Sequence, residues 1–130
     1  MGFVIMPGVK ISPDIYWVGA VDWNVKHFHG HTFNTKRGTT YNSYLILDEK
    51  VTLIDTVYTP FAEEMIDNIR QIIPPEKIDY IIVNHAEPDH SGAFPEILKL
   101  CPKAKIFGTV KCKEGLQKQY FGNWDFQIVK

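Results

Sequence analysis

The feature that most constrains the fold of this chain is an alternation of strand-like and helix-like patterns after residue 42. Runs rich in aromatic and β-branched residues predict strands, and apolar residues spaced three or four apart predict helices. Strands alternating with helices imply an α/β layered domain. The predicted strands are 15–18, 43–47, 51–54, 78–83, 104–107 and 126–129. The strands 43–47 and 51–54 are expected to pair as a hairpin. The predicted helices are about 60–73, a segment after residue 91, and 110–120.

Local signals set several of these boundaries. Thr59 is a residue type that caps helices and Pro60 suits a first helical position, so the helix near 60–73 should begin there. The run 78–83 is apolar over most of its length, which is typical of a strand buried on both faces. Ser91 is expected to cap the helix that follows it.

The composition excludes two classes of partner. The 130 residues carry 14 basic and 15 acidic side chains, so no broad positive field is available to hold nucleic acid or an anionic membrane. No apolar run approaches the ~20 residues of a membrane-spanning helix, and residues 1–7 lack the features of a secretion signal. We therefore expect a cytoplasmic protein.

Cys101 and Cys112 match no metal or redox spacing and are expected to be unreactive thiols.

The strongest candidate for chemistry is the loop that follows the predicted strand 78–83. Four of its six residues are potential metal ligands, namely His85, Glu87, Asp89 and His90. In an extended segment, residues two apart point the same way, so the first three would converge while His90 faces a neighbouring position. One short loop can therefore serve two adjacent metal ions.

The ligand types narrow the choice of metal. Imidazole nitrogen and carboxylate oxygen suit zinc, iron and manganese, whereas calcium prefers oxygen alone and copper(I) prefers sulfur. Histidines paired with carboxylates are a common setting for non-haem iron, because anionic oxygens stabilise the higher charge of oxidised iron. The structural alternative is a solvated turn in which Asp89 and His90 cap the helix that begins near Ser91.

The spacing His85-x-Glu87-x-Asp89-His90 resembles the motif of flavodiiron proteins, the oxygen and nitric oxide reductases whose diiron site lies in a metallo-β-lactamase-like domain. The resemblance implies an α/β fold of the αββα sandwich type, of which residues 1–130 would be the N-terminal part. Four other segments also resemble the leading segments of this family: 19–24, 28–30, 37–45 and 53–57.

The resemblance implies a role for each residue of the motif. His85 and Glu87 would bind one iron and Asp89 the other, while His90 ligates the second iron in some relatives only. His29 resembles a histidine beside the diiron pocket, where it would hydrogen-bond bound oxygen or nitric oxide species. Hydrolytic members of the same superfamily have His where this chain has Glu87, in a pattern that suits zinc-activated water. Glu87 therefore favours iron and redox chemistry.

The resemblance also implies that residues 1–130 contain only part of a complete site. A complete flavodiiron site takes a further His, a bridging carboxylate and a last His from later segments, followed by a flavodoxin-like domain that binds FMN. No His follows His90 and the only later Asp is Asp125, so we expect an incomplete diiron domain that does not itself bind FMN. Open positions would be filled by water, so metal binding should be weak or partial.

The resemblance implies a reductase of O2 to water or of NO to N2O, with electrons from FMN and a redox donor such as rubredoxin. Two alternatives stay open. One is a metallo-β-lactamase-like zinc hydrolase in which Asp89 orients an attacking hydroxide, and the other is an inactive fragment with a weak metal site. Half of a layered domain leaves apolar faces uncovered, which predicts self-association, with swapped strands as one route.

Several other polar residues are assigned structural roles. Asp55 ends an apolar strand, where α/β folds place functional groups, but a carboxylate that caps the backbone amides of Thr56 or Val57 explains it as well, and we favour this explanation. Asp22, Trp23, Tyr41 and Asn42 are expected to pack or pin the loops around the site.

Overall fold

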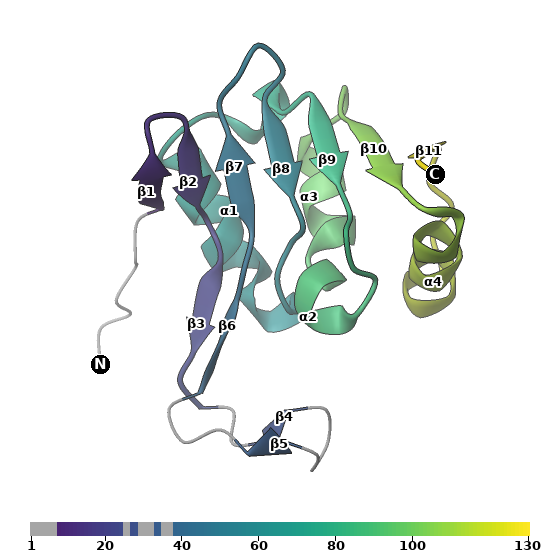
Figure 1. Cartoon of the computed structure of the whole chain (residues 1–130), viewed down its shortest axis with the longest axis horizontal. Coiled ribbons are helices and arrows are strands. Elements are labelled where there is room, and N and C mark those ends of the chain that lie inside the picture. The colour runs from purple at the N-terminus through teal and green to yellow at the C-terminus, as the bar shows by residue number, and fades with distance from the viewer. Residues whose placement is uncertain (1–7, 25–26, 29–32, 35–37) are drawn as a thin grey trace.

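The structure, a computed structural model, describes residues 8–24 and 38–130, together with the backbone of residues 27–28 and 33–34. Its centre is a seven-stranded sheet with the order β1-β2-β7-β8-β9-β10-β11, and β3-β6 and β4-β5 form two small sheets (Figure 1). The strands are β1 Val9–Ser12, β2 Ile15–Trp17, β3 Ala20–Asp22, β4 His27–Phe28, β5 Phe33–Asn34, β6 Thr39–Tyr41, β7 Tyr44–Ile46, β8 Thr52–Ile54, β9 Tyr80–Ile82, β10 Lys105–Gly108 and β11 Phe126–Ile128.

The strands of the large sheet divide into two groups by direction. Strands β1, β2, β7 and β8 pair antiparallel, which confirms the predicted hairpin, whereas β8, β9, β10 and β11 pair parallel. Parallel neighbours finish at the same edge of a sheet, so the residues that follow β8, β9 and β10 lie together there. The loop with the four potential ligands is one of these three segments.

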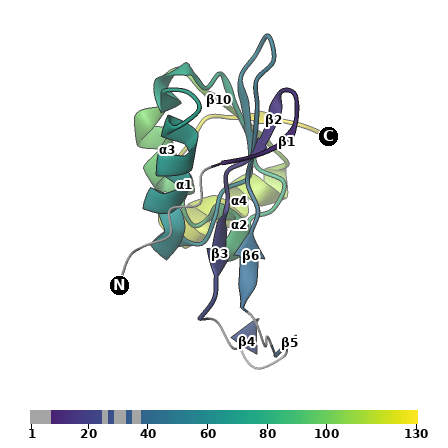
Figure 2. The ribbon, with the colours of Figure 1, turned by 90° about the vertical axis from the view of Figure 1, so that its left-hand side faces the viewer.

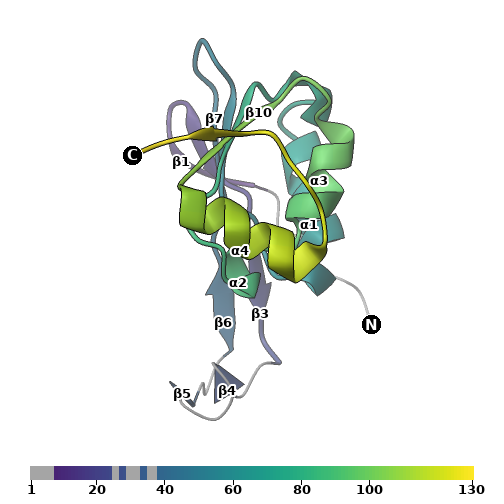
Figure 3. The same ribbon diagram turned by 90° about the vertical axis from the view of Figure 1, so that its right-hand side faces the viewer.

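The helices lie on one face of the sheet and at the carboxyl ends of its parallel strands. Helices α1 and α3 cover the face that lies to the rear in Figure 1, as the side view in Figure 2 also shows. Helices α2 and α4 lie side by side at the strand ends (Figure 3). The helical segments are η1 Thr59–Phe61, α1 Ala62–Arg70, η2 Pro75–Lys77, α2 Pro88–Ser91, α3 Phe94–Leu100 and α4 Val110–Tyr120.

A row of buried apolar residues crosses the four central strands and forms the core. Leu45, Leu53, Ile81 and Ile106 are neighbours in the strand register, and none is more than 5% exposed. Burying such a side chain stabilises the fold by about 1.5–3 kcal/mol, so this row contributes much of the stability. The helices complete the same cluster with fully buried side chains of Met65, Ile69, Phe94 and Ile97.

The opposite face of the sheet is only partly covered. In β9, Ile81 is buried, whereas Tyr80 and Ile82 on either side of it are partly exposed. The prediction that segment 78–83 is buried on both faces is therefore wrong. An apolar run does not reveal which face receives helices, and among the described residues helices cover only one.

Two predicted helix caps are also wrong. Thr59 donates its hydroxyl to the backbone oxygen of Gly92 at 3.2 Å, and the residue that precedes η1 is Tyr58. Ser91 lies inside α2 rather than before α3, because Pro88 starts a short helical turn earlier than expected. Helix α4 matches its prediction residue for residue, and Thr109 caps it by accepting the backbone N–H of Cys112 at 3.1 Å.

Candidate metal centre

The candidate ligands lie on the segment that joins β9 to α3, which we call the ligand loop and define as residues 84–91. Residues 84–86 belong to no helix or strand, and Glu87 is extended with a φ of -65° and a ψ of 148°. A residue before proline is held away from helical angles, and proline at the first helical position favours the turn that follows. The predicted two-residue alternation therefore stops at Glu87, and Asp89 and His90 lie on α2.

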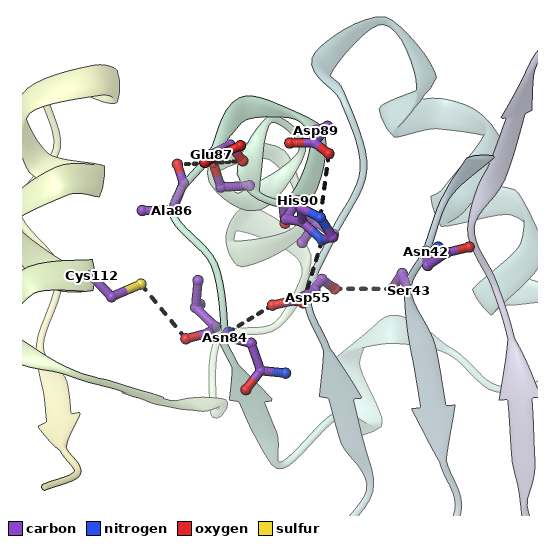
Figure 4. A network of polar contacts seen from close by, with 12 residues as sticks. Asn42, Ser43, Asp55, Asn84, Ala86, Glu87, Asp89, His90 and Cys112 are labelled. Atoms are coloured by element: carbon purple, nitrogen blue, oxygen red, sulfur yellow. Dashed lines mark hydrogen bonds and ion pairs between the residues drawn. The ribbon is translucent and has the colours of Figure 1, made fainter. Parts of the chain in front are cut away.

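Asp55, directly after β8, holds the start of the ligand loop (Figure 4). Its Oδ1 accepts the backbone N–H of Asn84 at 2.7 Å, and the backbone N–H of His85 also binds this carboxylate. Asp55 has a φ of 58°, a left-handed conformation that Asp tolerates better than most residues. Ser43 donates its hydroxyl to the backbone oxygen of Asp55 at 2.9 Å, which fixes this turn from β7. The contacts of Asp55 are structural, as favoured, but the expected partners are wrong: the carboxylate binds the backbone of Asn84 and His85 rather than that of Thr56 or Val57.

Thr56 holds the other end of the ligand loop. Its backbone N–H donates to the backbone oxygen of His90 at 2.7 Å, and its hydroxyl donates to the same oxygen at 3.0 Å. Asp55 and Thr56, two consecutive residues, therefore bind both the beginning and the end of the loop. The loop conformation is consequently tied to the end of β8.

Two candidate ligands, His85 and Asp89, and the structural residue Asp55 gather around His90. The rings of His85 and His90 stack with their centroids 4.9 Å apart, and His90 Nε2 lies 3.3 Å from Asp89 Oδ2. On the other side of the ring, His90 Nδ1 lies 3.6 Å from Asp55 Oδ2, which is too long for a hydrogen bond. Figure 4 shows this His90 ring between the two carboxylates. Glu87 is exposed.

Histidine and carboxylate side chains suit a metal such as iron. The structure places some of the candidate ligands close together, but not all of them. Within the described ranges, no three His, Cys, Asp or Glu side chains lie close enough to hold one ion. His90 Nδ1 is nevertheless a buried polar atom without a hydrogen-bond partner, and buried polar atoms are normally satisfied. A ligating His commonly has a carboxylate at its other ring nitrogen, as Asp55 is placed here.

Burial raises the pKa of several side chains, including Asp55 beside the ligand loop. Burial raises the pKa of Asp55, although the backbone N–H of Asn84 and the nearby His90 oppose the shift. Burial also raises the pKa of the Cys112 thiol, and it raises that of Cys101 to about 12. Both cysteines are buried and free, so at neutral pH they are protonated and poor nucleophiles, as expected from their spacing.

The residues expected to pin nearby loops do so with one exception. Tyr41 donates its hydroxyl to Asp22 Oδ2 at 2.7 Å, and Trp17 Nε1 donates to Asn42 Oδ1 at 3.0 Å. Trp23 is 65% exposed, so its expected packing role is wrong. His29, the predicted residue beside the diiron pocket, lies outside the described residues.

The sequence did not point to the residues of α4 that touch the ligand loop. Gln119 Nε2 donates to the backbone oxygen of Ala86 at 2.8 Å, and the Tyr120 hydroxyl lies 2.8 Å from Ser91 Oγ. The only signal in the sequence was that these residues lie on one side of a predicted helix, and this does not identify the segment that this side contacts. These contacts are 33 and 29 residues apart in sequence, beyond the range of local patterns.

Comparison with known proteins places this geometry in a family. The model of a family described as ODP family beta lactamase matches residues 39–125. A nitric oxide reductase of Moorella thermoacetica is 53% identical over 123 residues, which are 94% of this chain and 31% of that protein. The chain therefore spans about a third of the length of such relatives.

Within the described residues, no helix is both long and apolar enough to cross a membrane.

Solved structures give the same result. The rubredoxin oxygen:oxidoreductase from Desulfovibrio gigas is similar with a TM-score of 0.88 and 40% identity, over 95% of this chain and 31% of that one. The flavodiiron protein from Giardia intestinalis has a TM-score of 0.84 and 39% identity, over 96% and 30%. The expected α/β, metallo-β-lactamase-like fold is confirmed, and the chain belongs to the flavodiiron proteins through their ODP family beta-lactamase domain.

Proposed function

We propose that this chain supplies part of the ligand set of a non-haem diiron centre in an oxidoreductase that reduces O2 to water or NO to N2O. The observation that carries the proposal is the arrangement around His90, with Asp55 at one ring nitrogen and Asp89 at the other. Relatives of the chain include a nitric oxide reductase and an oxygen oxidoreductase, which supports both substrates. Iron, when bound, would transfer electrons to the substrate.

Each candidate ligand has a proposed task. His85 and Glu87 bind one iron, and Asp89 and His90 bind the other. Asp55 and Thr56 do not bind metal but hold the loop that carries all four ligands. In this arrangement the Nδ1 atom of His90 lies toward Asp55 and the Nε2 atom is the one that would bind a metal ion, since a ligating histidine commonly has a carboxylate at its other ring nitrogen.

The remaining parts of the site come from outside the residues described above. The ligand loop provides two imidazoles and two carboxylates, fewer donors than two iron ions need, so the proposed centre takes further ligands from outside this loop. FMN and an electron donor such as rubredoxin would act with a complete flavodiiron protein rather than with these 130 residues alone. We propose that His29 lies beside the diiron pocket and that the protein works in the cytoplasm.

Metal analysis with matched variants tests the proposal. The purified chain is loaded with Fe(II) without oxygen, and bound iron and zinc are measured by elemental analysis after desalting. We expect iron below two ions per chain, and less still in Glu87→Gln. The control is Glu49→Gln, the same change at an exposed turn residue. Equal iron retention by all three proteins would contradict the assignment of Glu87 as a ligand.

A zinc hydrolase is not favoured as the function. The relatives described above are reductases, and Glu87 stands where hydrolytic members have His. Glu87→His distinguishes the two chemistries, since it should weaken iron retention and strengthen zinc retention. Tighter binding of iron by the Glu87→His chain would count against the redox proposal.

Self-association is proposed as a property of this chain by itself. The sheet face opposite α1 and α3 carries partly exposed apolar residues, including Ile54, Ile82 and Phe107. Contiguous apolar surface of this kind tends to be covered by another chain or segment. Light scattering at increasing concentration should show species larger than 15.0 kDa. A single monomeric species at every concentration would contradict this proposal.

A further inference from the structure

One face of α4 packs on the hydrophobic core, and its last two turns also contact the ligand loop. The residues involved are three or four positions apart and therefore share one side of the helix. Core burial explains Cys112 and Leu116, but it does not explain Gln119, which is exposed. The residues of this face are Cys112, Gly115, Leu116, Gln119 and Tyr120.

The contacts follow the loop in order. Cys112 Sγ lies 3.6 Å from the backbone oxygen of Val83, just before the ligand loop. A Cβ atom at Gly115 would lie 3.2 Å from the Ala86 Cβ, so the helix and the loop approach closely at this point. Gln119 Nε2 donates to the backbone oxygen of Ala86 at 2.8 Å. The helix therefore contacts the loop beside the first metal-ligand candidates.

The donors around Ser91 can be assigned from chemistry alone. Ser91 Oγ lies 2.9 Å from the backbone oxygens of both Ala86 and Glu87, and 2.8 Å from the Tyr120 hydroxyl. Carbonyl oxygens only accept, so the single Ser91 proton is shared by those two oxygens and Tyr120 must donate to Ser91. Ser91 is fully buried, and a chain of hydrogen bonds runs from Tyr120 through Ser91 to the loop backbone.

These hydrogen bonds fix the two peptide groups on either side of Glu87. The Ala86 oxygen belongs to the peptide group before the Glu87 Cα atom, and the Glu87 oxygen belongs to the peptide group after it. The orientations of these two planes determine φ and ψ of Glu87, and with them the direction of its Cα–Cβ bond. The backbone N–H groups of His90 and Ser91 also bind the Glu87 oxygen, while α4 contributes the bond from Gln119 to the Ala86 oxygen and the bond from Tyr120 to Ser91. Contacts from α4 therefore help to set the direction in which the backbone presents the Glu87 side chain.

We infer that Gln119 and Tyr120 are positioning residues that hold the backbone of Glu87 in the orientation needed for this residue to bind a metal ion. The inference about metal rests on the proposed function, whereas the inference about the loop conformation does not. Neither residue touches the metal. Both act through the backbone of residues 86–87.

Matched substitutions separate this role from a general contribution to stability. Tyr120→Phe removes only the hydroxyl, and Tyr80→Phe makes the same change at the opposite end of β9. Gln119→Ala removes the amide bound to Ala86, and Gln117→Ala removes one on the same helix that instead binds Asn123 at 2.8 Å. Each pair compares the same chemical change with and without a contact to the ligand loop.

Two measurements are made on the five proteins. The first is amide NMR and hydrogen exchange of the metal-free chain, in which Gln119→Ala and Tyr120→Phe should shift the amides of residues 85–91 and speed their exchange about 3- to 10-fold. The second is anaerobic Fe(II) titration, in which the same variants should raise the Kd about 3- to 10-fold. Both controls should behave as wild type in both measurements.

The outcomes distinguish the inference from the proposed function. Unchanged loop amides in Gln119→Ala and Tyr120→Phe, or equal changes in the controls, would overturn the inference. Altered loop amides in Gln119→Ala and Tyr120→Phe, together with a wild-type chain that binds no Fe(II), would support the positioning role and defeat the metal proposal. If Tyr120→Phe does not fold, Gln119→Ala still decides the matter, because Gln119 is exposed and its loss leaves the core intact.

Discussion

The carboxylate of Asp55 lies 3.6 Å from the Nδ1 atom of His90 and at the same time binds the backbone N–H of Asn84 at 2.7 Å. One side chain at the end of β8 thus contacts both the first residue of the ligand loop and a candidate ligand near its end. The residue next to it, Thr56, binds the backbone oxygen of His90. The geometry of the loop therefore depends on a strand that contributes no ligand.

Removing the Asp55 carboxylate should destabilise the fold. Asp55→Ala leaves the backbone donors of Asn84 and His85 without their acceptor, which we expect to cost about 2–4 kcal/mol. Asp55→Gly should cost about 1 kcal/mol less, because glycine adopts the φ of 58° without strain. Urea denaturation measures both. Asp48→Ala, at an exposed turn whose Asp also accepts a backbone N–H, should change stability by about 0.5 kcal/mol or less.

Equal losses in Asp55→Ala and Asp48→Ala would show that the Asp55 contacts do not hold the ligand loop in place. The result would also count against the proposal that Asp55 orients the His90 ring.

The two faces of the sheet should differ in their response to substitution. Leu53 is fully buried beneath the helices, so Leu53→Ala should cost about 2–5 kcal/mol. Ile54 is the next residue and points to the partly exposed face, so Ile54→Ala should cost clearly less, about 1 kcal/mol. Chemical denaturation of both variants gives the comparison. Similar losses would mean that the second face is covered in solution, as self-association would produce.

The end of α4 offers a stabilising change. Phe121 follows the helix in a left-handed conformation with a φ of 54°, and its side chain is 92% exposed. Glycine adopts this conformation freely, so Phe121→Gly should raise the free energy of unfolding by about 1 kcal/mol. The control is Lys118→Gly inside α4, which should lower it by about 1 kcal/mol. A loss of stability in Phe121→Gly would indicate that the exposed ring makes contacts in solution.

The stability of the chain should depend on pH through Asp79. Its pKa is lowered by the backbone N–H of Val51, which donates to Oδ2 at 2.9 Å, and by Lys103, whose Nζ lies 3.2 Å from Oδ1. A carboxyl with a lowered folded-state pKa contributes stability above its unfolded pKa and loses it as the pH falls through the folded value. The advantage of wild type over Asp79→Asn should therefore shrink below about pH 4.

The companion variant for this pH measurement is Lys103→Ala. It should weaken the pH dependence without abolishing it, because the hydrogen bond from Val51 remains. An advantage over Asp79→Asn that stays constant from pH 6 to pH 2 would contradict the role given to Asp79, since about two pH units on either side of its unfolded pKa span the titration.

The larger elements could be predicted from sequence because each has a period or a run that burial imposes. The hairpin of β7 and β8 and the helix α4 were predicted in this way. The four-residue helix α2 was missed because it is shorter than the pattern that would reveal it, although Pro88 at its start was a usable signal. Because α2 was not predicted, Asp89 and His90 were wrongly expected to continue the two-residue alternation of an extended segment.

The composition of the candidate site could be predicted from sequence, but its support could not. The four candidate ligands lie within six residues, whereas the groups that hold them are distant: Asp55 binds Asn84 29 residues away, and Thr56 binds His90 34 residues away. Such contacts depend on the parallel pairing of β8 with β9, and one sequence does not reveal which parallel strands are neighbours. The roles of Gln119 and Tyr120 were hidden for the same reason.

The central claim is that the ligand loop binds iron through its histidines and carboxylates. The most direct test is X-ray absorption at the iron edge on the chain loaded with Fe(II) in the absence of oxygen. We expect only nitrogen and oxygen neighbours, with imidazole scattering that decreases in His85→Ala and in His90→Ala. Bound iron without imidazole scattering, or a spectrum that both substitutions leave unchanged, would contradict the claim.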